Sequence, residues 1–172
     1  MRFTQLDKIV ALQKGKSICA VKGLALSEEY LQDHFPRFPV MPGVLMLEAM
    51  FQASSWLVRA STEFALSSVA LKESKSLKFQ GFVQPGNTLE VFAEIKSVNE
   101  LTFNLKVKGT INGETATSGR LVVEAYNLSE RDGIDEAIDR YMNHQQRLMF
   151  RRLCDPLDPN NPDKLEKTSL VH

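Results

Sequence analysis

The chain has 172 residues, of which 43% are hydrophobic and 24% are charged, with 21 basic and 21 acidic side chains. This length suits one domain that buries its own core without metals or disulfides. The balanced charge gives no support for a nucleic-acid partner or for an anionic membrane surface.

The cysteine count and the hydropathy pattern bear on the cellular compartment. Cys19 and Cys154 are too few for a disulfide framework or a metal cluster, so we expect free thiols in a reducing cytoplasm. The first 17 residues show no secretory signal, and the most apolar helical segment is too short and too polar to span a membrane. We therefore expect a cytoplasmic protein that has neither a membrane nor a nucleic acid as its partner.

The first part of the chain combines strand-like segments with one strongly apolar helix. Residues 8–24 predict two strands around a turn at Gly15, and residues 27–32 predict a short helix with Ser27 as its N-cap. Residues 43–60 predict a helix that is apolar on nearly all sides, which other structure must enclose.

Four strand-like segments follow the apolar helix: residues 67–79, 88–98, 101–109 and 114–125. Turn-forming residues separate them, so we expect an antiparallel meander of four strands. A sheet of this kind wrapped around the buried helix is an α+β fold of the hot-dog architecture, which we assign to residues 1–126 as a single domain. An open strand edge would favour pairing with a second copy.

Residues 127–172 form a C-terminal extension in this interpretation. Residues 134–153 predict an amphipathic helix whose polar side includes Asp139. The stretch that follows has prolines at positions 156, 159 and 162 and little apolar content. We expect this tail to be poorly ordered or wrapped along a surface.

The loop of residues 34–42 leads into the apolar helix and carries His34, one of only three histidines. Its prolines at positions 36, 39 and 42 restrict the backbone. Histidine exchanges protons near neutral pH. His34 is therefore a candidate acid–base catalyst, with a capping or packing role as the alternative.

Two residues of the helix are further candidates. Glu48 is the only charged residue between positions 44 and 58, and a carboxylate in an apolar helix suits proton transfer in a desolvated site. A buried salt bridge, for instance to Arg59 or to a strand lysine, is the alternative. Gly43 at the helix start lets a ligand approach free backbone N–H groups that can polarise a carbonyl. A simple helix entry explains this glycine equally well.

Two motifs resemble those of a known enzyme family. The segment HFPRFPVMPGVLMLEAMFQ (residues 34–52) resembles the active-site signature of the FabZ-type (3R)-hydroxyacyl-[acyl-carrier-protein] dehydratases, which are hot-dog proteins. The segment KFQGFVQPGNTLEV (residues 78–91) is similar to the second hallmark of that family, a strand that ends in a Pro-Gly turn. The resemblance covers about residues 5–125. It implies dehydration of (3R)-hydroxyacyl thioesters to trans-2-enoyl thioesters in fatty-acid or related acyl-chain biosynthesis.

The family pattern also implies a role for each motif residue. His34 is the catalytic histidine and Glu48 is the catalytic acid. The N–H of Gly43 holds the thioester carbonyl, and the carbonyl of Val40 orients the histidine. The two side chains of one site come from different protomers of a homodimer, and three such dimers can form a trimer of dimers. The resemblance implies no metal or organic cofactor, and it implies an acidic acyl carrier protein as the partner that delivers the substrate.

Contacts to the substrate and to the carrier protein are predicted around this site. The acyl-tunnel candidates are apolar: Phe35, Met41, Leu45, Phe51 and Phe82. The candidate carrier-protein contacts are basic: Arg37, Lys72, Lys75 and Lys78, with Arg147, Arg151 and Arg152 further along the chain. Ordinary core packing and solvated surface charge are the respective alternatives for each residue.

The chain departs from the family pattern at three positions. Arg37 stands where a small residue is usual, and Phe82 stands where a proline is usual. Ser55 stands where a glycine is common. These changes alter the loop and the tunnel, so the chain-length preference stays open. A hot-dog acyl-thioesterase and a non-catalytic acyl-binding homologue are the alternative functions.

Overall fold

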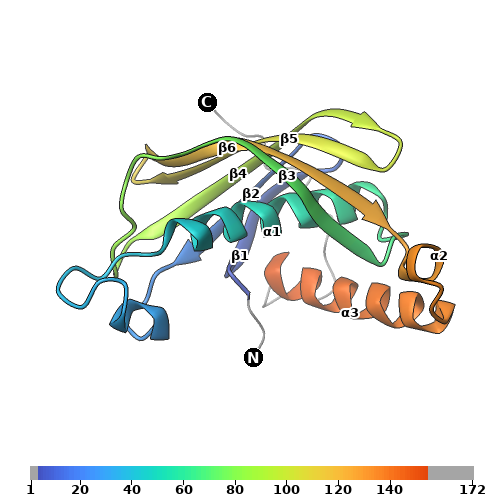
Figure 1. The fold of residues 1–172 in the computed structure, drawn as a ribbon, viewed down its shortest axis with the longest axis horizontal. Coiled ribbons are helices and arrows are strands. Elements are labelled where there is room, and N and C mark those ends of the chain that lie inside the picture. Colours follow the sequence, from blue (N-terminus) through green and yellow to red (C-terminus); the bar gives the residue numbers. More distant parts are fainter. Residues whose placement is uncertain (1–3, 155–172) are drawn as a thin grey trace.

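A long helix, α1 (Gly43–Ser61), lies against one face of a six-stranded antiparallel sheet in the computed structural model, which describes residues 4–154 (Figure 1). The strands are β1 (Lys8–Gln13), β2 (Ser17–Gly23), β3 (Ser68–Phe79), β4 (Thr88–Asn99), β5 (Thr102–Ile111) and β6 (Glu114–Tyr126). Their order across the sheet is β1-β2-β4-β5-β6-β3. The predicted α+β fold, with an antiparallel sheet around a central helix, is confirmed.

The position of β3 differs from the predicted meander of four strands. β3 pairs with β6 and forms the edge of the sheet opposite β1. Only β4, β5 and β6 form a meander. Tight turns join these strands, and Asn112 and Gly113 between β5 and β6 have φ values of 51° and 84°, as a two-residue hairpin turn requires. The longer connection from β3 to β4, residues 80–87, carries the chain past β5 and β6.

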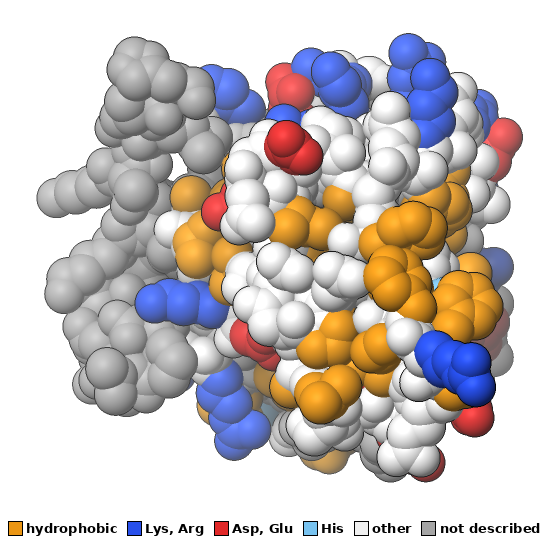
Figure 2. Space-filling model, turned by 90° about the vertical axis from the view of Figure 1, so that its left-hand side faces the viewer, with side chains coloured by type: hydrophobic (Ala, Val, Ile, Leu, Met, Phe, Trp, Pro, Cys, Tyr) orange, Lys and Arg blue, Asp and Glu red, His pale blue; other side chains and the backbone are white. Residues whose placement is uncertain are grey.

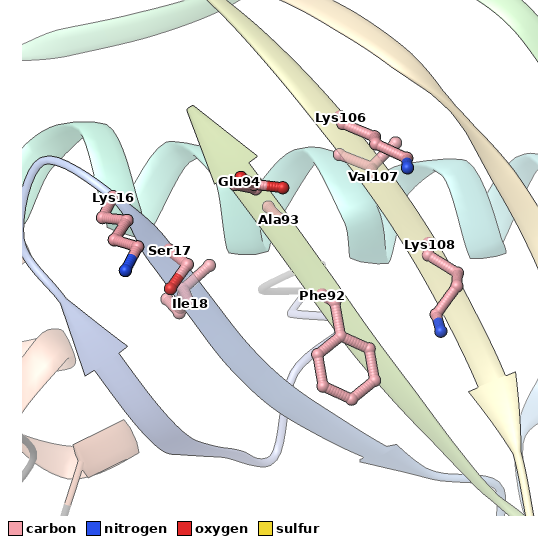
Figure 3. Close-up of a pocket in the computed structure, with 9 residues that line it drawn as sticks. All are labelled: Lys16, Ser17, Ile18, Phe92, Ala93, Glu94, Lys106, Val107 and Lys108. Carbon is pink, nitrogen blue, oxygen red and sulfur yellow. The ribbon is translucent and has the colours of Figure 1, made fainter. Parts of the chain in front are cut away.

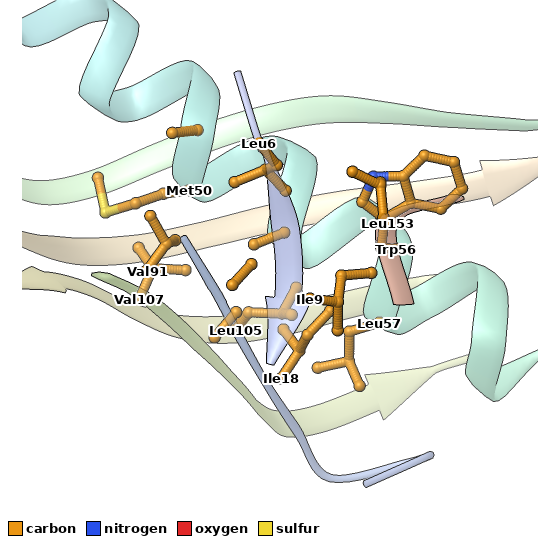
Figure 4. Close-up of a cluster of buried hydrophobic side chains, with 14 of the residues drawn as sticks. Leu6, Ile9, Ile18, Met50, Trp56, Leu57, Val91, Leu105, Val107 and Leu153 are labelled. Atoms are coloured by element: carbon orange, nitrogen blue, oxygen red, sulfur yellow. The ribbon is translucent and has the colours of Figure 1, made fainter. Parts of the chain in front are cut away.

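The buried face of α1 forms the core together with the sheet (Figure 4). Met50 and Leu57 on the helix have exposed fractions of 0%, as do Val91 on β4 and Leu121 on β6. Complete burial of such a side chain stabilises the fold by about 1.5–3 kcal/mol. This packing fixes α1 on the sheet, and with it the candidate residues at the start of the helix.

The other face of α1 is left open by this chain along its N-terminal half, so the enclosure of this half by other structure stays a prediction. Val44 is 69% exposed, and Leu47, Glu48 and Phe51 are partly buried. The reason is that the C-terminal extension covers only the second half of the helix (Figure 1).

The extension folds as two helices, α2 (Leu128–Asp132) and α3 (Glu136–Cys154), where the sequence predicts a single helix over residues 134–153. The ring of Phe150 on α3 lies 6.0 Å from that of Trp56 on α1, and both side chains are buried. The predicted proline-rich tail, residues 155–172, lies outside the described residues. The domain boundary after residue 126 stays a prediction.

Asp139 of α3 is buried, contrary to its predicted place on the polar side of the helix. Its carboxylate accepts hydrogen bonds from the N–H groups of Leu128 and Ser129, at 3.0 and 3.1 Å. Asp139 thereby satisfies the free N–H groups at the start of α2, which the flanking residue Asn127 does not cap with its own side chain.

A short 3-10 helix, η1 (Glu29–Gln32), precedes the loop that carries His34. Its N-cap residue is Glu28, so the predicted cap at Ser27 is wrong. The Glu28 side chain accepts a hydrogen bond of 2.6 Å from Lys22 and does not cap the helix.

Candidate active site

Backbone hydrogen bonds fix the loop around His34 at several points. The N–H of His34 donates to the carbonyl of Tyr30 (3.1 Å), and its own carbonyl accepts from the N–H of Val40 (3.0 Å). Phe35 and Phe38 exchange two backbone hydrogen bonds, of 3.3 and 3.0 Å. The His34–Phe35 peptide bond is cis. The backbone hydrogen bonds thus restrict this loop in addition to its prolines.

The imidazole of His34 is partly buried and has a defined orientation. Its Nδ1 atom lies 3.0 Å from the carbonyl oxygen of Val40. A carbonyl oxygen only accepts hydrogen bonds, so Nδ1 carries the hydrogen of the neutral ring and Nε2 presents a free lone pair. This contact has the form that the family pattern implies for Val40, although its role in catalysis stays a prediction.

Glu48 is partly buried in α1 and is held by a neighbouring amide. The side chain of Gln52, one turn further along, donates a hydrogen bond of 2.7 Å to Oε1 of Glu48. The side-chain oxygen of Gln52 in turn accepts the N–H of Gln5 at 2.8 Å. Within residues 4–154 Glu48 forms no ion pair, so the alternative of a structural salt bridge is wrong for this part of the chain.

Arg59, the suggested salt-bridge partner, has a different environment. Its guanidinium donates a hydrogen bond to the hydroxyl of Ser55 and lies 5.7 Å from the centre of the Trp56 ring. Burial lowers the pKa of Arg59 to about 10. Ser55, which departs from the family pattern, is thus a hydrogen-bond partner of this arginine.

The start of α1 presents a free backbone N–H group. The N–H groups of Leu45 and Met46 donate to the carbonyl of Pro42, at 2.9 and 3.2 Å. The N–H of Gly43 comes before them and has no acceptor among the described residues 4–154. A Cβ atom at position 43 would lie 3.1 Å from the ring of Phe79. A side chain at position 43 would therefore press on this ring, which would have to shift by a few tenths of an ångström.

The acyl-tunnel candidates occupy different environments. Phe35 and Phe82 are 53% and 67% exposed, whereas Met41 is buried in the core. Leu45 and Phe51 on α1 are partly buried. Figure 2 shows hydrophobic side chains gathered on the end of the molecule where the loops of residues 24–42 and 80–87 lie.

Two further aromatic residues lie at this end of the molecule and are not among the predicted site residues. Phe38 and Phe79 are 45% and 48% exposed. Phe38 meets Phe82 edge to face, with 5.7 Å between the ring centres. Phe79 lies in the second family motif, and this motif could have indicated that Phe79 lies near the site. Phe38 lies in the first family motif, but its contact with Phe82 could not be predicted, because it joins two loops that lie far apart in the sequence.

The basic candidates do not form one cluster. Lys72 pairs with Glu124 at 3.1 Å, and Lys75 pairs with Glu73 at 2.9 Å. Lys78 lies six residues after Lys72 on β3, which corresponds to about 20 Å along an extended strand. Arg37 is exposed and lies in the same loop as His34, three residues further along the chain. It is therefore the basic candidate that is nearest to the site in sequence.

A cavity of about 390 Å³ lies on the face of the sheet that points away from α1 (Figure 3). Lys16, Phe92, Lys106 and Lys108 are among the residues that line it. None of its lining residues belongs to the His34 loop or to α1. This cavity is therefore separate from the candidate active site.

Metal-binding clusters and membrane-spanning helices are both absent from residues 4–154. No three histidine, cysteine or acidic side chains in this range come together as a group that could hold a metal ion. No helix in the same range combines the length and the apolar character that crossing a bilayer requires.

Comparison with known proteins gives matches in sequence and in structure. The model of the FabA-like domain family matches residues 1–126. The 3-hydroxyacyl-[acyl-carrier-protein] dehydratase FabZ of Ruminiclostridium cellulolyticum is 34% identical over 119 residues, which are 69% of this chain and 84% of that protein.

Solved structures share the fold at low sequence identity. The dehydratase heterocomplex ApeI:P from Xenorhabdus doucetiae gives a TM-score of 0.61 at 16% identity, over 76% of this chain and 88% of that one. A point mutant of the fluoroacetyl-CoA-specific thioesterase FlK gives 0.56 at 17% identity, over 72% and 94%. The fold alone therefore does not separate a dehydratase from a thioesterase.

The sheet wrapped around α1 defines a protein of the hot-dog class, as predicted. The sequence matches narrow the assignment further. The chain belongs to the FabA-like family, and its relatives named FabZ confirm the predicted class of enzyme, a 3-hydroxyacyl-[acyl-carrier-protein] dehydratase.

Proposed function

We propose that the protein dehydrates (3R)-hydroxyacyl thioesters carried on acyl carrier protein, with His34 as the base and Glu48 as the acid. The observation that carries this proposal is the hydrogen bond between Nδ1 of His34 and the carbonyl of Val40, at 3.0 Å. It leaves Nε2 as a proton acceptor held in one orientation, as general base catalysis requires.

In the proposed reaction the thioester carbonyl oxygen accepts the free N–H of Gly43. Nε2 of His34 then removes a proton from C2, and the developing negative charge on the oxygen is stabilised by that N–H and by the positive end of the α1 dipole. Protonated Glu48 donates its proton to the departing 3-hydroxyl group. The C2–C3 double bond forms, water leaves, and solvent exchange restores the proton on Glu48 and removes the one from His34.

The proposed working unit is a homodimer in which His34 of one copy acts with Glu48 of the other. Within residues 4–154 no hydrogen bond or ion pair joins His34 to Glu48 in one chain. The open half of α1, with Val44 at 69% exposure, is an apolar surface that a second copy would cover. The edge strand β3 offers unpaired backbone groups for the same contact. A trimer of such dimers is the larger assembly that we propose.

The substrate arrives on acyl carrier protein in the cytoplasm in this proposal, and Arg37 contacts the carrier. The exposure of Arg37 in the loop that carries His34 supports this placement, since a basic rim would attract an acidic carrier.

The test is an assay of the purified protein with a 3-hydroxyacyl thioester, in which enoyl absorbance and free thiol are both followed. Substitutions His34→Ala and Glu48→Gln should each lower kcat by roughly 100- to 10,000-fold. Matched controls are His144→Ala and Glu100→Gln, which change exposed residues on α3 and in the β4–β5 turn. Full activity in either site variant would reject the residue assignment. Thiol release without enoyl product would identify a thioesterase, and substrate binding without either product would identify an acyl-binding protein.

A further inference from the structure

Three phenylalanines in the loops around His34 are linked to it through ring contacts and backbone hydrogen bonds. The ring of Phe35 stacks on the imidazole with 4.3 Å between centres. Phe38 is tied to Phe35 by their two backbone hydrogen bonds, and its own ring meets Phe82 at 5.7 Å. We call Phe35, Phe38 and Phe82 the aromatic strip.

The outer end of the aromatic strip is held in place although it is exposed. The N–H of Met41 donates to the carbonyl of Val83 at 2.8 Å, so the two loops that carry Phe38 and Phe82 are joined next to these rings. The rings meet at an interplanar angle of 85°, an edge-to-face arrangement that is favourable between aromatic rings. Nearly half of Phe38 and two thirds of Phe82 nevertheless face solvent, at 45% and 67% exposure. The chain therefore presents a fixed apolar surface beside the site.

Position 82 is one of the places where the chain departs from the family pattern. Phe82 stands where the family pattern has proline, and a proline ring cannot extend to an edge-to-face contact with Phe38. The substitution thus adds apolar surface at one place only, at the end of the aromatic strip.

We propose that Phe38 and Phe82 are a specificity-determining pair that favours 3-hydroxyacyl thioesters with long, unbranched apolar chains. This inference rests on the proposed function, in which C2 lies at His34 and the thioester carbonyl lies at Gly43. The acyl chain beyond C3 then follows the aromatic strip outward. A four-carbon substrate ends close to His34, whereas a longer chain reaches Phe38 and Phe82. Each methylene group that leaves water for this surface strengthens binding by about fourfold.

The experiment compares a ten-carbon with a four-carbon 3-hydroxyacyl thioester in the variants Phe82→Pro, Phe38→Ala and the double variant. The ratio of kcat/KM for long over short chains should fall by roughly tenfold in each single variant, mainly through KM. Because the two rings act as one surface, the double variant should lose little more than either single variant. Leu101→Ala is the matched control, since Leu101 is also exposed (42%) but lies in the β4–β5 turn.

An unchanged ratio in both single variants, or an equal loss for both chain lengths, would overturn the proposal. Calorimetric binding of unreactive 3-hydroxyacyl amides of the same two lengths provides a measurement that does not depend on turnover. If the native protein dehydrates neither thioester, the proposed function fails. The ratio of the two binding affinities in the native protein and in Phe82→Pro still decides the role of the pair.

Discussion

Gln52 fixes the orientation of Glu48 through a hydrogen bond of 2.7 Å from its side-chain N–H to Oε1 of the carboxylate. The orientation of the Gln52 amide is itself determined, because its oxygen accepts the backbone N–H of Gln5 at 2.8 Å. A backbone N–H can only donate, so the amide oxygen faces Gln5 and the NH₂ group faces Glu48. Gln52 is therefore a positioning residue for the proposed acid.

The substitution Gln52→Leu should lower kcat by about tenfold with little change in KM, since it removes one hydrogen bond from the proposed acid but none from the substrate. Steady-state kinetics with one thioester would measure both parameters. Gln13→Leu, an exposed position at the end of β1, is the matched control. A rise in KM at constant kcat would contradict the positioning role.

Mixing two inactive variants tests whether the site is shared between copies. Dimers that contain one His34→Ala chain and one Glu48→Gln chain have one intact and one doubly damaged site if the pair comes from different chains. Random exchange makes about half of all dimers mixed, so activity should return to about a quarter of the native value. Activity would be measured after co-expression of two differently tagged chains and purification through both tags. If isolated dimers are purified, this raises the expected value to about half; if the proposed trimers of dimers are purified, the expected value stays at about a quarter. No recovery in the doubly tagged dimer would show that both residues act within one chain.

Local sequence signals were sufficient for most of the fold, and the failures have physical causes. The hairpin turn at Asn112 and Gly113 requires positive φ values, so it was visible in the residues themselves. The place of β3 beside β6 was not visible, because strand order depends on contacts between distant segments. The contact between Phe38 and Phe82 was hidden for the same reason.

The part of the candidate site that lies in one short segment could be predicted from the sequence. His34, Val40 and Gly43 lie within ten residues, and the prolines between them restrict the loop. The partial exposure of Glu48 was not predictable, because the composition of α1 indicates burial without saying which chain supplies the cover.

Charge reversal at Arg37 tests the proposed contact with the carrier protein. Arg37→Glu should lower kcat/KM by about tenfold with carrier-bound substrate at low salt, because an attractive charge becomes repulsive. The same variant should leave turnover of a small thioester mimic nearly unchanged. Lys72→Glu is the control. Lys72 is already paired with Glu124, and it lies on β3 and not in the loop that carries His34 and Arg37. Equal losses with both substrates would place Arg37 in the site itself and reject the carrier contact.

Asp139 links α3 to the start of α2, and this link should make stability depend on pH. Hydrogen bonds from Ser129 and then from Ser67 hold the pKa of Asp139 below its ordinary value. Since its folded-state pKa is depressed, the stabilisation is fully present above the unfolded pKa of an aspartate, about 3.9, and is lost as the pH falls through the lower folded-state pKa.

The variant Asp139→Asn should therefore lower Tm by about 2–4 °C at neutral pH. The difference from the native protein should shrink as the pH falls below about 4. Thermal unfolding followed by circular dichroism would measure both, with Asp132→Asn at the exposed end of α2 as the control. Equal Tm values at neutral pH, or a difference that grows on acidification, would show that the carboxylate of Asp139 does not stabilise the extension.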